Sequence, residues 1–230
     1  MTKHRKRTTL IAGLFTLTCL AQIPMSGIAA EGDRYTMPVT VNLAGEQKSI
    51  SPYIYGVNDP GDGSNVRNVT ANAVRQGGNR YTGYNWENNY SNAGEDWHNS
   101  SDTNIGDITD GAGYAARRLS DTCTKYNVPY KITTLQMAGY VAADKSGTVS
   151  EAEAAPSSRW NAVKFKKDTA LSLEPDLTDN AVYMDEYVNY IVQTLGDASN
   201  STGMQGYSLD NEPVLWNDTH PRLHGEEVSN

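Results

Sequence analysis

The segment Tyr207-Ser208-Leu209-Asp210-Asn211-Glu212-Pro213 contains the strongest indication of the fold in this chain. Residues 205–209 predict a short strand, which ends in three polar side chains and a proline. Pro213 disfavours helical dihedral angles at Glu212, so the strand should end sharply there. In parallel α/β folds, functional groups gather at the carboxyl ends of the strands. We therefore expect Glu212 to lie at the ligand-binding edge of a parallel sheet.

Three other segments have the same form, a short apolar run that ends in polar side chains. The predicted strands are residues 53–57, 74–77 and 130–137, which lead to Asn58 and Asp59, to Asn79 and Arg80, and to Gln136. These polar residues are expected at the same sheet edge as Glu212.

Apolar residues at steps of three and four predict two amphipathic helices. The first covers residues 112–123 with Asp110 as its N-cap, and the second begins after Asp179 and ends before Gly196. A short helix is also expected at residues 65–73, whereas residues 81–107 and 142–178 are expected to be loops. Strands that alternate with helices predict parallel βα units.

The polar strand ends favour a (β/α)8 barrel, or TIM barrel, over a doubly wound sheet. Both folds bind ligands at strand ends, but no G-x-G-x-x-G motif follows the first predicted strand. A complete barrel takes about 250 residues, and residues 51–230 provide about four βα units. Either these residues form a half barrel, or residues 51–230 are an incomplete TIM-barrel catalytic domain and the chain is an N-terminal fragment of a longer enzyme. No internal repeat is visible that would indicate a self-sufficient half.

The N-terminal residues have the features of a secretory signal peptide. Residues 1–30 combine a basic start, a short apolar run and small residues at 26–30. Residues 35–43 alternate weakly and predict a strand, so residues 31–50 form a segment of their own. We expect a secreted, extracellular protein.

The charge, the hydropathy and the cysteine content limit the kinds of partner and covalent cross-link that we expect. The net charge is −8, and removal of residues 1–30 would take away four basic residues and no acidic ones. An acidic protein is a poor nucleic-acid partner, because phosphate binding depends on Lys and Arg. No later segment is apolar enough to cross a membrane. Cys123 is the single cysteine after residue 30, so no disulfide is expected there, and we expect its side chain to be buried.

Glu212 at the end of a barrel strand, directly after Asn211, suits glycoside hydrolysis. A carboxylic acid there protonates the leaving oxygen, and the adjacent amide contacts the 2-hydroxyl of a sugar. The alternative is that Asp210 and Glu212 are surface carboxylates that cap a helix.

A second segment, residues 75–90, combines a glycine turn with polar and aromatic side chains. Gly77 and Gly78 allow the backbone to approach a ligand closely, and Asn79 and Arg80 follow as donors. Aromatic rings with polar edges suit stacking on sugars, and the candidates here are Tyr81, Tyr84, Trp86 and Tyr90. The alternative is a tyrosine-rich loop that packs on itself.

Both segments resemble glycoside hydrolase family 44, a family of secreted bacterial endo-β-1,4-glucanases and xyloglucanases. The resemblance covers most of the chain after residue 30, in residues 50–56, 77–94, 182–186 and 209–213, and at Trp216, Thr219 and His220. It implies a (β/α)8 barrel beside a small β-sandwich, to which the strand within residues 31–50 would belong. It also implies that the partner is a β-1,4-glucan polysaccharide and that no cofactor is required for catalysis.

The family resemblance implies a retaining mechanism with Glu212 as the general acid/base. The nucleophile in such enzymes is a second Glu on a later strand, which this chain does not reach, so we expect the chain alone to be inactive and prone to aggregate. The alternative function is a non-catalytic glucan-binding fragment. For either function, the predicted substrate-binding residues are Asn79, Arg80, Tyr84, Trp86, Trp97 and Trp216.

Two metal sites are conceivable from the sequence. Glu87, Asp176 and Asp179 offer the oxygen ligands that suit a structural calcium ion, and the family resemblance supports this reading. The alternative is that Asp179 caps a helix and the others are solvated. His220 and His224 are four residues apart, a spacing that suits zinc on a helix, although substrate contact or structural bonding is the stronger alternative.

Overall fold

The computed structural model describes residues 37–42 and 45–226, which belong to two units, residues 1–47 and 48–230. In the first unit, residues 37–42 are exposed and have no regular secondary structure, so the strand predicted at 35–43 does not form there. The physical reason is that no described strand pairs with them. The predicted signal peptide at 1–30 lies outside the described residues.

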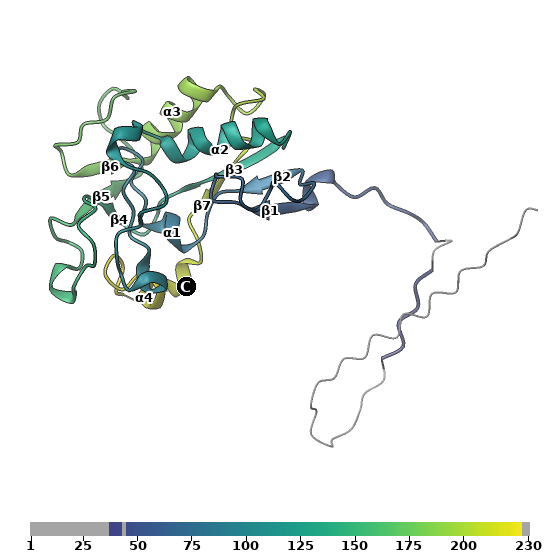
Figure 1. The fold of residues 1–230 in the computed structure, drawn as a ribbon, viewed down its shortest axis with the longest axis horizontal. Coiled ribbons are helices and arrows are strands. Elements are labelled where there is room, and N and C mark those ends of the chain that lie inside the picture. The colour runs from purple at the N-terminus through teal and green to yellow at the C-terminus, as the bar shows by residue number, and fades with distance from the viewer. Residues whose placement is uncertain (1–36, 43–44, 227–230) are drawn as a thin grey trace, which may run out of the picture. The chain divides into compact units, whose positions relative to one another are not determined.

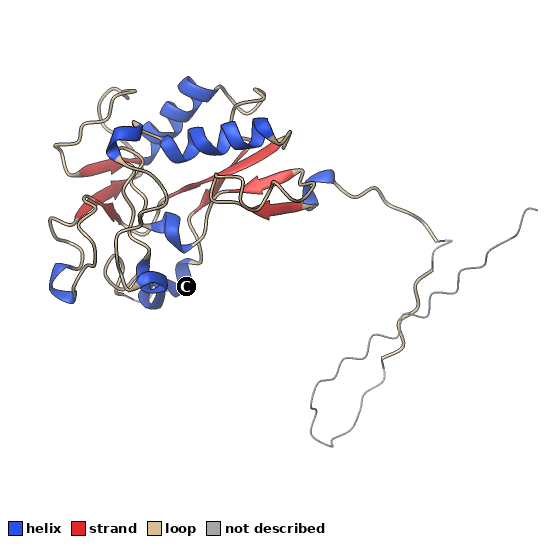
Figure 2. Ribbon diagram, in the orientation of Figure 1, coloured by secondary structure: helices blue, strands red, loops and turns tan. Residues whose placement is uncertain are grey.

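In the second unit, a four-stranded parallel sheet confirms the four predicted strands. Its members are β1 (Gly56–Asn58), β2 (Ala73–Arg75), β3 (Tyr130–Leu135) and β7 (Gly206–Leu209), in the order β1-β2-β3-β7 (Figures 1 and 2). β1 is shorter than predicted, because Pro52–Ile54 form a 3-10 turn, η1. The parallel order brings all four carboxyl ends to one edge.

Helices α2 (Tyr114–Lys125) and α3 (Met184–Leu195) lie side by side over the strands (Figure 1). The predicted apolar face of α2 is buried, including Leu119 and Cys123. The helix begins later than expected because Asp107 and Asp110 form a capping box around a separate 3-10 turn, η3 (Ile108–Asp110). A short helix was expected at residues 65–73, but residues 65–72 form turns and irregular structure and Ala73 begins β2.

A second, three-stranded sheet was not predicted. It consists of β4 (Tyr140–Ala142), β5 (Trp160–Lys164) and β6 (Ala181–Tyr183), with β4 antiparallel to β5 and β5 parallel to β6. β6 occupies the residues after Asp179 that were expected to be helical, and α3 therefore starts at Met184. Strands of three to five residues are too short to give a sustained period in the sequence.

Short helical turns carry the chain across the carboxyl edge of the main sheet. They are α1 (Asn79–Thr82), η2 (Gly94–Trp97), η5 (Pro213–Leu215) and α4 (Trp216–Thr219), whereas η4 (Glu151–Glu153) lies between β4 and β5 of the second sheet. Figure 1 shows α1 and α4 together on the side away from α2 and α3, and η2 contacts both. No helix among residues 37–42 and 45–226 is long and apolar enough to cross a membrane.

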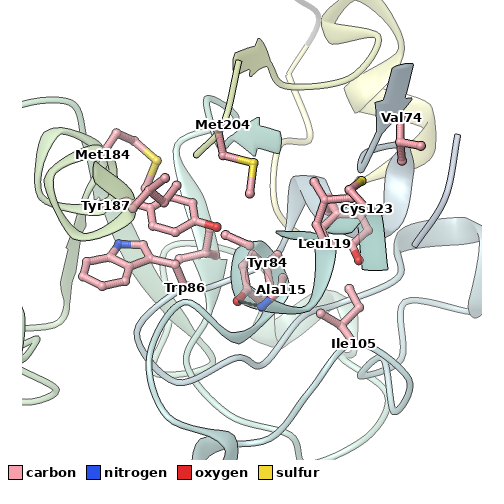
Figure 3. Packing of buried hydrophobic residues seen from close by; sticks show 14 of the residues in the cluster. Val74, Tyr84, Trp86, Ile105, Ala115, Leu119, Cys123, Met184, Tyr187 and Met204 are labelled. Carbon is pink, nitrogen blue, oxygen red and sulfur yellow. Dashed lines mark hydrogen bonds between the residues drawn. The ribbon is translucent and has the colours of Figure 1, made fainter. Parts of the chain in front are cut away.

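Two hydrophobic clusters hold the second unit together. The larger one joins the sheet to α2 and α3, and Figure 3 shows Trp86, Tyr187 and Met184 packed together within it. The smaller cluster lies beneath α4, and its buried members are Ala138, Val149, Trp160, Trp216 and Leu223. The two clusters fix the elements that surround the carboxyl edge of the sheet.

Candidate active site

The ends of β2, β3 and β7 meet around Asn211. Its Oδ1 accepts a hydrogen bond from Arg75 Nη2 at 3.1 Å, and its Nδ2 donates to Asn79 Oδ1 at 2.8 Å. The same Nδ2 donates to Glu212 Oε2 at 3.1 Å. The prediction that Asn79 and Asn211 share one face is therefore confirmed. Arg75 was not predicted as a site residue, because it lies within an expected strand rather than after one.

Asp210 holds this end of β7 from beneath. Its side chain is buried, and Oδ1 accepts hydrogen bonds from Thr82 Oγ1 at 2.7 Å and from the Asn211 backbone N–H at 2.8 Å. Oδ2 accepts from the Met137 backbone N–H at 2.7 Å. One carboxylate thus ties α1, the end of β3 and the end of β7 together, which excludes the alternative that Asp210 is a solvated surface residue.

Glu212 projects from a backbone conformation that is uncommon for a residue with a side chain. It is exposed, with φ 44° and ψ 58°, and it occupies the N-cap position of η5 without a capping hydrogen bond from its side chain. The left-handed region costs an L-residue roughly 1–2 kcal/mol. Such strain persists when surrounding contacts determine it, and it gathers at functional sites. Here the Asp210–Asn211 network on one side and Pro213 on the other hold the Glu212 carboxylate beside the Asn211 amide.

Trp216 is a positioning residue and not an open stacking platform. Its ring is 6% exposed, and its Nε1 donates to the Asn211 carbonyl at 2.9 Å. Because the ring is buried, the predicted substrate contact of Trp216 cannot be stacking on a sugar. The position of Trp216 in the sequence indicated that it lies near Glu212, but it did not indicate which way the indole ring points.

His220 supports Asn79 from the opposite side. Its buried ring places Nε2 2.8 Å from the Asn79 carbonyl, and burial lowers its pKa. His224 Nδ1 faces the Ala138 carbonyl at 3.1 Å, so the two imidazoles serve different backbone groups. Within residues 37–42 and 45–226, no three His, Cys, Asp or Glu side chains converge on a metal position. The zinc reading is not supported, and structural bonding accounts for both rings.

Tyr84 and Trp86 belong to the core, so their predicted stacking on substrate is wrong. Trp86 is 0% exposed and lies parallel to Tyr187, with ring centroids 5.2 Å apart (Figure 3). Tyr84 is also buried, and its hydroxyl donates to Asn89 Oδ1 at 2.7 Å. Burial raises the pKa of Tyr84 well above its usual value. Tyr81 and Tyr84 pack edge to face within the segment, as the alternative reading held, whereas Trp86 packs on α3.

Arg80 and Trp97 instead line a cavity of about 420 Å³ beside η2. Arg80 makes two parallel bonds to the buried Asp102, of which Nη2 to Oδ1 measures 2.7 Å. Trp97 is 66% exposed. Asp96 lines the same cavity and accepts a hydrogen bond from Asn79 Nδ2 at 3.0 Å, which links the cavity to the Asn211 network. Substrate binding by Arg80 and Trp97 stays a prediction.

The expected calcium ligands show a partial fit. Glu87 Oε2 is buried without a hydrogen-bond partner, and burial together with the nearby Asp179 and Glu186 raises the Glu87 pKa to about 8. Asp179 and Asp176 bond to their own loops, at Ala181 N and Thr178 respectively. An unpartnered carboxylate among other acids suits a cation, but the side chains do not enclose one among the described residues. Calcium binding stays a prediction.

A carboxylate held beside an asparagine at the end of a parallel strand, near a cavity with an exposed Trp, is typical of glycoside hydrolases. The sequence profile of glycoside hydrolase family 44 matches residues 90–230, and the chain belongs to this family. This confirms the family resemblance found in the motifs.

Relatives support the same assignment. The chain is 51% identical over 197 residues to the beta-mannanase/endoglucanase A of Caldicellulosiruptor saccharolyticus, a match that covers 83% of this chain and 14% of that protein. It is 47% identical to endoglucanase A of Paenibacillus lautus, over 99% of this chain and 32% of that protein. The chain therefore spans less than a third of each relative.

The solved structures agree with this assignment. The family 44 endoglucanase Cel44A of Clostridium thermocellum matches with a TM-score of 0.73 and 50% identity, over 81% of this chain and 37% of that one. A family 44 xyloglucanase of Paenibacillus polymyxa, solved with xyloglucan, matches with a TM-score of 0.72 and 49% identity, over 79% of this chain and 36% of that one. The α/β fold with its parallel sheet is thus that of family 44 structures.

Proposed function

We propose that this chain carries the acid/base part of a site for endo-acting hydrolysis of β-1,4-glucan, outside the cell. The observation that carries the proposal is the fixed pair of Asn211 and Glu212 at the end of β7. The names of the relatives, endoglucanase and xyloglucanase, support a glucan substrate. The proposal includes a barrel that residues 51–230 form in part.

Glu212 is proposed to act as the general acid and then as the general base. Its carboxylic acid gives a proton to the glycosidic oxygen as the bond to the sugar breaks, and the carboxylate later removes a proton from the attacking water. Asn211 is proposed to contact the 2-hydroxyl of the sugar. Because Arg75 occupies Asn211 Oδ1, the Nδ2 group is the one that faces Glu212.

A retaining mechanism also requires a nucleophilic carboxylate about 5–5.5 Å from the acid/base. Among the described residues, Asn211 is the one hydrogen-bond partner of the Glu212 side chain. We propose that a later part of the protein supplies the nucleophile, so that the 230 residues alone bind glucan without cleaving it. The non-catalytic glucan-binding function is the second candidate, and the cavity at Trp97 favours it as well.

A chimera tests the acid/base role. Residues 48–226 replace the matching part of Cel44A of Clostridium thermocellum, which is 50% identical in sequence, and hydrolysis of carboxymethyl cellulose and xyloglucan is measured. Glu212→Gln should lower kcat by roughly a thousandfold or more while substrate affinity stays within a few-fold, because the amide keeps the shape but gives no proton. Asp218→Asn, an exposed carboxylate on α4, is the matched control. An active chimera that is insensitive to Glu212→Gln would disprove the role.

A further inference from the structure

A second cavity lies at the carboxyl ends of the strands, and none of the predicted substrate-binding residues lines it. It has a volume of about 400 Å³ and is lined by residues 137–140 after β3, by Ala155 and Pro156, and by residues 223–226 after α4. The volume falls within the range of small-molecule sites. No lining residue is shared with the cavity at Trp97.

Two contacts connect the walls of this cavity to the residues that precede Glu212. On one wall, the Met137 backbone N–H donates to Asp210 Oδ2 at 2.7 Å. On the other, the His224 ring lies edge-on to Trp216 with centroids 5.2 Å apart, and Trp216 Nε1 donates to the Asn211 carbonyl. The cavity is therefore anchored to the Asp210–Asn211 end of β7 from both sides.

The walls offer an apolar surface of the kind that a pyranose ring requires. The buried Ala138 and Leu223 lie behind this surface in the smaller cluster, and the half-buried Tyr140 packs against that cluster. Met137 is 37% exposed. The carbon face of a glucosyl ring is apolar and packs on aromatic rings whose edges are polar. Tyr140 with Met137 presents such a surface beside the catalytic strand end.

His224 supplies a polar group with a defined direction. Its Nδ1 is 3.1 Å from the Ala138 carbonyl, and a carbonyl accepts hydrogen bonds but cannot donate them. Nδ1 therefore carries its proton in this contact. In the neutral ring, Nε2 then holds a lone pair that accepts a hydrogen bond. A sugar hydroxyl group can donate such a hydrogen bond to Nε2.

We propose that this cavity is a glucosyl subsite next to Glu212, in which a sugar ring packs on Tyr140 and donates a hydroxyl hydrogen bond to His224 Nε2. The inference rests on the proposed function, since a linear glucan cleaved internally must be held on both sides of the broken bond. It assigns binding roles to Tyr140 and His224.

Affinity gel electrophoresis of the full 230-residue chain in hydroxyethyl cellulose and in xyloglucan tests this proposal. Tyr140→Ala should weaken retardation roughly three- to tenfold, because it removes the stacking surface. His224→Phe should weaken it by a similar factor, because it keeps a ring against Trp216 but lacks the acceptor. Tyr55→Ala, which removes a ring that is 64% exposed and outside the cavity, should leave retardation unchanged.

A second measurement reports on His224 directly and uses the unaltered chain, so it does not require any variant to fold. The imidazole ¹⁵N resonance of Nε2 should shift when cellotetraose is added, as the lone pair accepts a hydrogen bond. Retardation of the unaltered chain with no effect of either variant and no shift would overturn the subsite and leave the proposed function standing. A chain that neither soluble glucan retards would overturn both.

Discussion

Replacing Asp210 by Asn should destabilise the protein substantially, although the two side chains have nearly the same shape. The Asp210 carboxylate accepts three hydrogen bonds, from Thr82 Oγ1, the Asn211 N–H and the Met137 N–H, in a buried position. An amide offers one acceptor oxygen and one NH₂ donor. If the oxygen replaces Oδ1, the NH₂ group faces the Met137 N–H, and two donors meet.

The expected magnitude follows from these three bonds. A hydrogen bond to a charged group contributes about 1.5–3 kcal/mol and a neutral one about 0.5–1.5 kcal/mol, so the two retained bonds lose about 1 kcal/mol each. The unpartnered Met137 N–H costs about 1–3 kcal/mol more. Part of this loss is offset, because a charge is no longer buried. We expect the free energy of unfolding to fall by about 3 kcal/mol.

Backbone strain does not contribute to the difference in stability between the unaltered protein and the Asp210→Asn variant. Asp210 has φ 56°, in the left-handed region, which Asn tolerates at least as well as Asp. Urea unfolding of the 230-residue chain, followed by tryptophan fluorescence, measures the free energy. For a domain of this size, about 3 kcal/mol corresponds to a melting temperature roughly 6–12 °C lower. Asp121→Asn, on the exposed side of α2, is the control and should change neither quantity.

The result that refutes this reasoning is a loss of less than about 0.5 kcal/mol for Asp210→Asn, equal to that of the control. Such a result would mean that the carboxylate does not tie the strand ends together. A further readout is Glu212 itself. In the chimera with Cel44A, Asp210→Asn should also lower kcat, since the Asn211–Glu212 pair loses its support.

Other predictions concern the core, the acidic site and the sheet edge. The Glu87 pKa of about 8 lies above its unfolded value, so stability should fall as pH rises from about 4.5 to 8, and Glu87→Gln should flatten that dependence in urea unfolding at several pH values. Calcium at millimolar concentration should raise the melting temperature at pH 8, and Glu87→Gln should abolish the increase; an equal increase in both proteins would exclude Glu87 as a ligand. Trp86→Ala should cost about 3–5 kcal/mol of unfolding free energy through loss of its packing on Tyr187, and a cost below 1 kcal/mol would contradict its place in the core. Leu209 is 66% exposed on β7, at the end of the strand order, and we expect this edge to self-associate. Leu209→Lys should therefore lower the apparent mass in sedimentation at high concentration, and an unchanged mass would contradict this.

The strands of the main sheet and the polar residues at its edge could be predicted from the sequence. Short apolar runs followed by polar residues located β1, β2, β3 and β7, because the strands of a parallel sheet are usually short apolar runs and polar groups gather at their carboxyl ends. Glu212 was found because a carboxylate after Asn and before Pro, at a strand end, is an uncommon local arrangement. The buried face of α2 followed from its period.

Only the tertiary structure shows which side chains are buried and which line a cavity. Trp86 and Trp216 have the composition of stacking platforms, but whether a ring is buried depends on α3 and on the Asn211 carbonyl, which no local pattern encodes. The three bonds to Asp210 join residues up to 128 positions apart. Periodicity and strand-end polarity are properties of neighbouring residues, so the sequence predicted them. Side-chain direction and long-range hydrogen bonds are properties of the packed chain, so the sequence did not predict them.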